Sequence, residues 1–362
     1  MSQPDEVLLV YGTRPELIKL AGIARLLRGR VSAVHTGQHY DPALYGEIAA
    51  TVGMDRPETV LDVGGRSRAR QIAAVLDGLD EVLEQHRPAA LVVQGDTNSA
   101  LAGGLAGNAR SVPVVHVEAG LRAHDRRMPE EHNRILLDHL ADLCLAPTDT
   151  SRSNLLAEGI PESRIVVTGN TVVEAVETHL PPPAARARLL ADLGLESDGF
   201  VLVTLHRPEN VDDPEVYRTI LGQLAALDPP VVLPIHPRSR DRLDRFGLAQ
   251  VTDRLRVVDP LDYPDFLGVA KEAALLISDS GGVQEEVSVL KRPVVVVRRS
   301  TERPEVLGSF ADLVDPGPAI GDAARRWLAA DRSALASIAS PYGDGSASQR
   351  SVDAIDALVG AV

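Results

Sequence analysis

Two series of short apolar runs, each alternating with helical patterns, constrain this chain more than any other feature of its sequence. The runs cover residues 7–11, 31–35, 90–93, 112–117, 143–146 and 165–167, and then residues 201–204, 231–235, 255–258, 275–278, 294–297 and 313–314. The clearest helical pattern, over residues 70–85, has one apolar stripe formed by Ile72, Val75, Leu76, Leu79, Val82 and Leu83. Strand and helix in alternation predict a parallel sheet with helices on both faces. We therefore expect an α/β fold with two Rossmann-like halves.

The length of the chain supports a division into two domains. A chain of 362 residues exceeds what one hydrophobic core usually supports. Pro181-Pro182-Pro183 separates the two series of runs and is typical of a linker. We expect an N-terminal domain over residues 1–172, a C-terminal domain over residues 173–345, and an amphipathic helix near the C-terminus. The cleft between two such domains is the expected ligand site.

Composition excludes several classes of protein. The net charge of −14 argues against nucleic acid or an anionic membrane as the main partner. Cys144 is the only cysteine, so the chain cannot form an internal disulfide, and a reducing cytoplasm is expected. Residues 1–6 do not resemble a signal peptide, and no apolar run reaches membrane-spanning length.

The stretch Leu275–Glu286 predicts an anion site. An apolar run ends at Asp279-Ser280, two glycines follow, and a helical pattern begins. A helix N-terminus beyond a parallel strand offers free N–H groups to a phosphate, and Gly281 and Gly282 let the phosphate approach the backbone. Glu286, one turn further, could accept hydrogen bonds from a ribose diol. The alternative is an ordinary turn in which Asp279 or Ser280 caps the helix.

Polar residues follow other predicted strands of the first half. Arg14 and Lys19 come after the first run, where two cations oppose the helix dipole unless an anion is bound; solvated surface charge is the alternative. Asp96 and Glu118 follow two further runs, although Asp96 could cap the next helix. Glu130, with the neighbouring acid Glu131, begins another helix, where acids also satisfy the dipole.

In the second half, His206 and Arg207 follow the first run and could hold a diphosphate together. Arg303 lies beyond the run at 294–297 and could add another cation. The chain has no G-x-G-x-x-G after a strand, no Walker A motif, no D-x-D and no zinc-ligand cluster. We therefore expect no nucleotide cofactor and no metal.

Several motifs in order resemble one family, the non-hydrolysing UDP-N-acetylglucosamine 2-epimerases of bacteria and archaea. They include Gly-Thr-Arg-Pro-Glu at 12–16, Gly-Gln-His at 37–39, Gly-Asp-Thr at 95–97, His-Val-Glu-Ala-Gly-Leu-Arg at 116–122, Pro-Glu-Glu at 129–131 before Asn133-Arg134, His-Arg at 206–207, Asp-Ser-Gly-Gly at 279–282 and Thr-Glu-Arg-Pro-Glu at 301–305. The resemblance spans about residues 7 to 307. It implies the two-domain GT-B architecture and a homodimer, and we expect the C-terminal helix, 346–362, to pack back on the N-terminal domain.

The resemblance also implies a reaction and roles for residues. UDP would leave by anti elimination, giving 2-acetamidoglucal, and would add back after a proton reaches the other face of C2. The implied proton-transfer residues are Asp96, Glu118 and Glu130, and His206 belongs with them in the catalytic set. The implied substrate-binding residues are Arg14, Lys19, Arg134, Ser280, Gly281, Gly282, Glu286 and Arg303.

Relatives in this family also bind a second, activating UDP-N-acetylglucosamine. The corresponding candidates are Gln38, His39 and His236. The sequence departs from many relatives at Pro208, where they have a second arginine, and at Gly308-Ser309-Phe310. Two alternatives are a GT-B glycosyltransferase, which would pass the sugar to an acceptor, and an epimerase of a related UDP-sugar.

Overall fold

The computed structural model describes residues 5–38, 49, 51–235 and 237–361, and it divides into two compact units. The N-terminal unit consists of residues 1–175 and 342–362, and the C-terminal unit of residues 176–341. The division falls inside helix α7 (Val172–His179). The three prolines are not a linker, because Pro182 is the N-cap of helix α8 (Pro183–Asp192) and Pro183 begins it. Proline fits the first turn of a helix, where its missing N–H costs nothing.

The described part of the N-terminal unit has a seven-stranded parallel sheet. Its strands in spatial order are β3 (Thr59–Val60), β2 (Val31–His35), β1 (Val7–Tyr11), β4 (Ala90–Gln94), β5 (Val114–Val117), β6 (Leu143–Ala146) and β7 (Ile165–Val167). The other helices of this unit are α1 (Arg14–Leu26), α3 (Arg68–His86), α4 (Asn98–Ala109), α5 (Pro129–Leu140), α6 (Asp149–Ala157), η1 (Glu162–Arg164) and α15 (Ala347–Val359).

The C-terminal unit repeats this plan with a six-stranded parallel sheet. Its strands in spatial order are β10 (Leu255–Val258), β9 (Val231–Pro234), β8 (Val201–Thr204), β11 (Leu275–Ser278), β12 (Val294–Val297) and β13 (Ala311–Val314). The remaining helices are α9 (Pro208–Val211), α10 (Pro214–Ala225), α11 (Pro237–Arg245), η2 (Ala249–Arg254), α12 (Tyr263–Glu272), α13 (Gly281–Leu290), η3 (Pro304–Val306), α14 (Ala319–Ala329) and η4 (Ser333–Ser337). The prediction of two Rossmann-like halves is confirmed.

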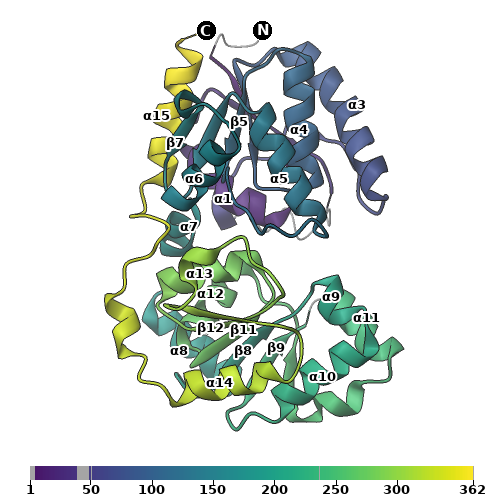
Figure 1. The fold of residues 1–362 in the computed structure, drawn as a ribbon, viewed down its shortest axis with the longest axis vertical. Helices are drawn as coiled ribbons and strands as arrows, with labels where there is room; N and C mark the ends of the chain where they lie inside the picture. The colour runs from purple at the N-terminus through teal and green to yellow at the C-terminus, as the bar shows by residue number, and fades with distance from the viewer. Residues whose placement is uncertain (1–4, 39–48, 50, 236, 362) are drawn as a thin grey trace. The chain divides into compact units, whose positions relative to one another are not determined.

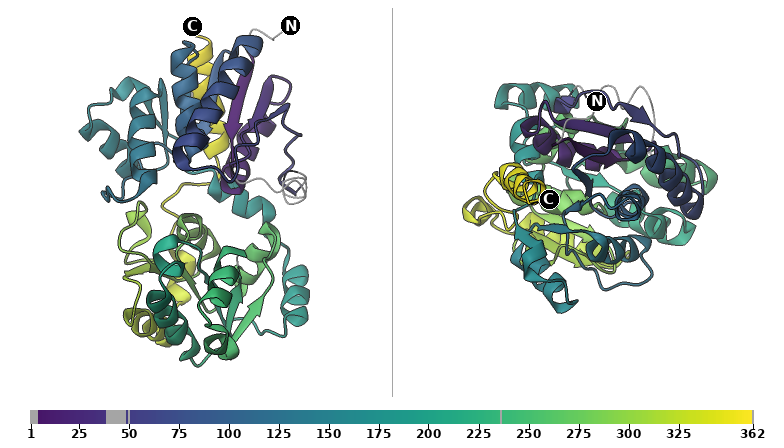
Figure 2. Two further views of the ribbon diagram at one scale, coloured as in Figure 1. Left: turned by 90° about the vertical axis from the view of Figure 1, so that its right-hand side faces the viewer. Right: turned by 90° about the horizontal axis from the view of Figure 1, so that it is seen from above.

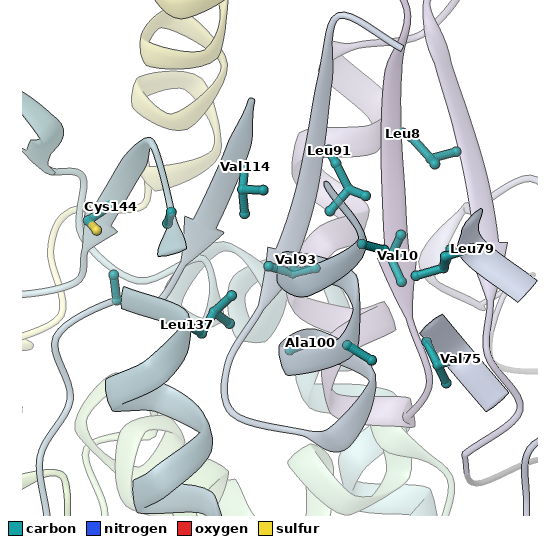
Figure 3. Close-up of a cluster of buried hydrophobic side chains, with 14 of the residues drawn as sticks. Leu8, Val10, Val75, Leu79, Leu91, Val93, Ala100, Val114, Leu137 and Cys144 are labelled. Carbon is teal, nitrogen blue, oxygen red and sulfur yellow. The ribbon is translucent and has the colours of Figure 1, made fainter. Parts of the chain in front are cut away.

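Each sheet has its own apolar core. In the N-terminal unit, Leu79 of α3 lies beside Val10 of β1, and Val75 and Val93 belong to the same buried cluster (Figure 3). In the C-terminal unit, the core contains strand residues such as Val203 and the buried face of α10. The central strands, such as β1, β4, β11 and β12, are buried on both faces, which is why they read in the sequence as uninterrupted apolar runs.

The C-terminal helix α15 belongs to the N-terminal unit and packs beside α1 (Figure 2). The backbone N–H of Ser348 donates to a carboxylate oxygen of Glu174 at 2.8 Å, and Arg30 forms an ion pair with Asp356. A side chain at Gly22 of α1 would overlap Ser348. The end of the chain is therefore a structural part of the unit in which the chain begins. No helix in the described ranges is both long enough and apolar enough to cross a membrane.

Candidate functional site

The strand orders place a topological switch point in each sheet. In the C-terminal unit, β8 pairs with β9 on one side and with β11 on the other (Figure 1). In the N-terminal unit, β1 occupies the same position between β2 and β4. In open α/β sheets, ligands bind outside the carboxyl ends of the strands at such a point. The loops after β8 and β11, and those after β1 and β4, are therefore the first places to examine.

At the switch point of the C-terminal unit, His206 after β8 meets Asp279 after β11. The Nδ1 atom of His206 lies 2.9 Å from Oδ1 of Asp279, and the backbone N–H of Arg207 donates to Oδ2 at 2.9 Å. Asp279 is fully buried, whereas the His206 side chain is 46% exposed. Burial alone would raise the pKa of Asp279. The charge and hydrogen bond of His206, with the bonds from Arg207 and Asn210, instead hold that pKa below its ordinary value.

Helix α13 begins immediately after Asp279, with Ser280 as its N-cap. Ser280 holds the N-cap position, but its side chain accepts no hydrogen bond from the helix, and the Asp279 carboxylate accepts from His206 instead. The alternative of an ordinary turn capped by Asp279 or Ser280 is therefore wrong. Gly281 and Gly282 form the first turn and are half-buried. Glu286, in the second turn, is 9% exposed. This helix start has the backbone geometry that suits an anion.

Arg303 is buried against the start of α13. Its Nε donates to Glu285 at 2.7 Å, and its Nη1 forms an ion pair with Glu302. A β-carbon at Gly281 would lie 2.7 Å from Nη1 of Arg303, so a larger residue there would require the guanidinium to shift. Arg303 therefore supports the first turn of α13, and the prediction that it binds substrate directly stays a prediction.

At the switch point of the N-terminal unit, Arg14 is the first residue of α1 and is partly exposed. Lys19, one turn later, is buried and forms an ion pair with Glu118 at the end of β5. The side-chain amide of Gln94 also donates to Oε2 of Glu118, at 2.8 Å. Glu118 has a left-handed backbone, with φ of 71°. Such conformations are uncommon for residues other than glycine and concentrate at functional sites.

Asp96 follows β4 and forms an ion pair with Arg134 of α5. Asp96 does not cap α4, because Thr97 is the N-cap and its hydroxyl accepts the N–H of Ala100 at 3.0 Å. Arg134 is 2% exposed and also pairs with Glu131. The partly exposed carboxylate of Asp96 is therefore held by a buried arginine.

The two acids at the start of α5 differ. Glu131 is 2% exposed and accepts the backbone N–H groups of Ala123 and His124 at 3.0 and 2.7 Å, so it fixes the loop after Glu118. Glu130 is partly exposed and has no hydrogen-bond or ion-pair partner among the residues that the structure describes. Of this pair, Glu130 is the acid available to a ligand.

Sequence reasoning missed Glu16, which joins the loops after β1 and β4. Its carboxylate accepts from the N–H of Gly12 at 3.0 Å and from the hydroxyls of Thr13 and Thr97 at 2.7 and 2.8 Å. Glu16 is 1% exposed, and burial raises its pKa from 4.5 to about 7 in spite of these hydrogen bonds. The available signal was its position three residues after Thr13, the spacing of a capping box.

Within each unit, the predicted residues gather at the switch point. In the N-terminal unit, Lys19 of α1 pairs with Glu118 after β5, and Asp96 after β4 pairs with Arg134. In the C-terminal unit, His206 after β8 contacts the loop after β11 that contains Ser280. The regulatory candidate Gln38 accepts from the N–H and hydroxyl of Ser99 at 3.0 and 2.9 Å, at the start of α4. The other two regulatory candidates, His39 and His236, lie outside the described residues. Among the residues that are described, no three His, Cys, Asp or Glu side chains are arranged to hold a metal.

Two all-parallel Rossmann-like units, each with charged loops at its switch point, define a protein of the GT-B class. Known proteins identify the family within this class. The family model described as UDP-N-acetylglucosamine 2-epimerase matches residues 27–356. A UDP-N-acetylglucosamine 2-epimerase of Methanocaldococcus jannaschii is 36% identical over an alignment of 359 residues, which covers 95% of this chain and 97% of that protein.

A second relative, the UDP-2,3-diacetamido-2,3-dideoxy-D-glucuronate 2-epimerase of Pseudomonas aeruginosa, is 34% identical over 319 residues, covering 85% of this chain and 88% of the relative. Among solved structures, the Methanocaldococcus jannaschii enzyme in complex with UDP-GlcNAc and UDP matches with a TM-score of 0.87 and 35% identity, over 97% of this chain and 99% of that one. This chain belongs to the UDP-N-acetylglucosamine 2-epimerase family.

Proposed function

We propose that this protein reversibly converts UDP-N-acetylglucosamine to UDP-N-acetylmannosamine without hydrolysing it. Family membership and the substrate named for the Methanocaldococcus relative support the proposal. The observation that carries it is the pair of acids Asp96 and Glu118 at the carboxyl ends of adjacent strands, each held by a buried cation, Arg134 or Lys19.

The reaction explains why several acids are needed. The hydrogen on C2 of the sugar is not acidic by itself, so its removal must be coupled to departure of UDP, leaving 2-acetamidoglucal. Inversion at C2 then requires a proton on the opposite face as UDP adds back. Proton-transfer groups are needed on two faces of the ring. We assign this work to Asp96, Glu118 and Glu130 together.

The diphosphate requires positive charge and N–H donors. We assign its binding to Arg14, His206, Ser280 and the N–H groups at the start of α13, and the ribose to Glu286. Charge on the departing diphosphate grows in the transition state, so these groups would accelerate elimination as well as bind substrate. Lys19 and Arg134 would hold the acids Glu118 and Asp96 in place, and Arg303 would support the first turn of α13.

Proton NMR of UDP-N-acetylglucosamine with the protein in deuterated water tests the proposal. We expect UDP-N-acetylmannosamine to appear, with deuterium at C2 of both sugars, because the proton that returns need not be the one removed. Epimerisation without C2 exchange would contradict the elimination mechanism. Free N-acetylmannosamine with UDP would indicate a hydrolysing epimerase, and an unchanged substrate would agree with a glycosyltransferase that waits for an acceptor.

A related UDP-sugar is the second candidate substrate, because the Pseudomonas aeruginosa relative is named for a diacetamido glucuronate. The same NMR experiment with that sugar nucleotide distinguishes the two. Turnover of the glucuronate derivative at a kcat/KM more than about 10-fold above that of UDP-N-acetylglucosamine, equivalent to about 1.4 kcal/mol, would favour the second substrate.

We also propose that the protein works as a homodimer in the cytoplasm, and that Gln38 with His39 and His236 binds an activating sugar nucleotide. The single cysteine agrees with a reducing compartment. Light scattering should give twice the mass of the chain, and cell fractionation should recover the protein with cytoplasmic markers. Gln38→Ala should weaken activation by added UDP-N-acetylglucosamine; rates that depend hyperbolically on substrate in both proteins would contradict the regulatory role.

A further inference from the structure

Asp279 is a buried acid near the proposed diphosphate site, and both of its oxygens have hydrogen-bond partners. Its Oδ2 accepts the backbone N–H groups of His206 and Arg207 at 3.0 and 2.9 Å and the side-chain amide of Asn210 at 2.9 Å. Its Oδ1 lies 2.9 Å from Nδ1 of the His206 ring. Because an ionised carboxylate only accepts hydrogen bonds, Nδ1 must carry a proton to bond with it.

We propose that Asp279 is a positioning residue, which holds the Nδ1–H of His206 and thereby presents Nε2 to the diphosphate of the substrate. This proposal rests on the function proposed above, in which His206 binds the departing diphosphate. Asp279 itself is fully buried, so it acts through His206 and does not touch the substrate. The His206 side chain, in contrast, is 46% exposed.

The arrangement has an electrostatic consequence for the reaction. A diphosphate oxygen that approaches Nε2 needs a proton there, and the ring then carries a positive charge. The buried carboxylate 2.9 Å from Nδ1 offsets that charge. The same carboxylate fixes the backbone of residues 206 and 207, so the ring is held in place before substrate binds. Groups fixed in advance stabilise developing charge without having to reorganise during the reaction.

The tautomer of His206 in the unliganded wild-type protein is the first test. Nitrogen NMR of histidine-labelled protein at about pH 8, above the ordinary pKa of histidine, distinguishes Nδ1–H from Nε2–H. The signal among ten histidines is assigned by its loss in His206→Gln. We expect Nδ1–H, and a ring protonated at Nε2 alone would overturn the proposal. This readout needs no turnover, so an inactive protein would contradict the proposed function while the spectrum still decides the role of Asp279.

Asp279→Asn is the second test. The amide oxygen introduced there would take the position of Oδ2, where three donors converge, and its NH₂ group would face Nδ1 of His206. The ring would then accept at Nδ1 and carry its proton at Nε2, as a neutral donor. We expect the reversed tautomer, a KM close to that of the wild type and a kcat lower by about 100-fold, because the departing diphosphate would meet no positive charge.

Ser239→Ala is the matched control. The Ser239 hydroxyl is buried and donates to the carbonyl of Leu205, next to His206, at 2.6 Å. The control should keep the Nδ1–H tautomer and a kcat within about 3-fold of wild type, less than 1 kcal/mol. An equal loss in the control would overturn the proposal, as would wild-type kcat in Asp279→Asn or in His206→Gln. If Asp279→Asn does not fold, the wild-type spectrum decides.

Discussion

Replacing Glu16 by glutamine should change how the stability of the N-terminal unit depends on pH. Glu16 is buried, and its pKa is raised from 4.5 to about 7. Glutamine has nearly the same shape and cannot ionise. Its oxygen can accept from Gly12 and Thr13, and the Thr97 hydroxyl can turn to accept from the new amide. The variant should therefore keep the native packing.

The direction of the effect follows from the two pKa values. Below pH 4.5, Glu16 holds its proton in the folded and unfolded chains alike, and the full stability is present. Between pH 4.5 and about 7, the unfolded chain releases the proton while the folded chain keeps it, so the free energy of unfolding falls as pH rises. At about 1.4 kcal/mol per pH unit, the loss over this window is about 3 kcal/mol. Above about pH 7 the loss is complete.

Urea unfolding of the wild type and Glu16→Gln at pH 5 and pH 8 measures this effect, with native-state hydrogen exchange of the β1 and β4 amides as the probe. The free energy of unfolding of the variant, minus that of the wild type, should increase by about 2 to 3 kcal/mol from pH 5 to pH 8. Trp327, the only tryptophan, lies in the C-terminal unit, so its fluorescence transition serves as an internal control. Parallel changes in the two proteins between pH 5 and pH 8 would refute the reasoning.

Three further predictions test other parts of the structure. Glu131→Gln should destabilise the protein by about 3 kcal/mol, because it breaks the buried ion pair with Arg134. Glu130→Gln should instead lower kcat about 100-fold and leave the urea midpoint unchanged. Equal urea midpoints for the two variants would contradict the structural role of Glu131. Asp213→Ala removes the N-cap of α10 and should cost about 1 kcal/mol by tryptophan fluorescence in urea; an unchanged midpoint would count against the cap. Burial raises the pKa of Cys144 to about 12, so a thiol reagent should modify it only after unfolding; rapid labelling of the native protein would contradict this.

The fold could be predicted largely from the sequence, because strands buried on both faces leave continuous apolar runs. The errors have local causes. The run at 112–117 begins as a strand only at Val114, since Pro113 lacks the N–H that a ladder requires. Strand β3 was missed because Thr59–Val60 has only two residues and lies at the edge of the sheet. The helical pattern was expected to begin after the two glycines, but the helix begins at Gly281. Glycine is unfavourable in the interior of a helix, so the pattern did not include these two residues.

The positions of the candidate site residues at strand ends could also be predicted, but their partners could not. Asp279 and His206 are 73 residues apart, and they meet only because β11 lies beside β8. Local patterns do not determine which strands are neighbours. Similarly, Glu130 and Glu131 are indistinguishable by composition, and only the direction of each side chain on α5 separates the exposed acid from the buried one.

The place of α15 beside α1 reverses the expected order of folding during synthesis. Domains usually fold as they leave the ribosome, with the N-terminal one first. Here the first unit lacks its last helix until residues 347–359 have been translated, whereas residues 176–341 already form a complete unit by then. The C-terminal unit can therefore complete its folding before the N-terminal unit. A premature stop codon shortly before residue 347 would remove α15 and leave the N-terminal unit incomplete.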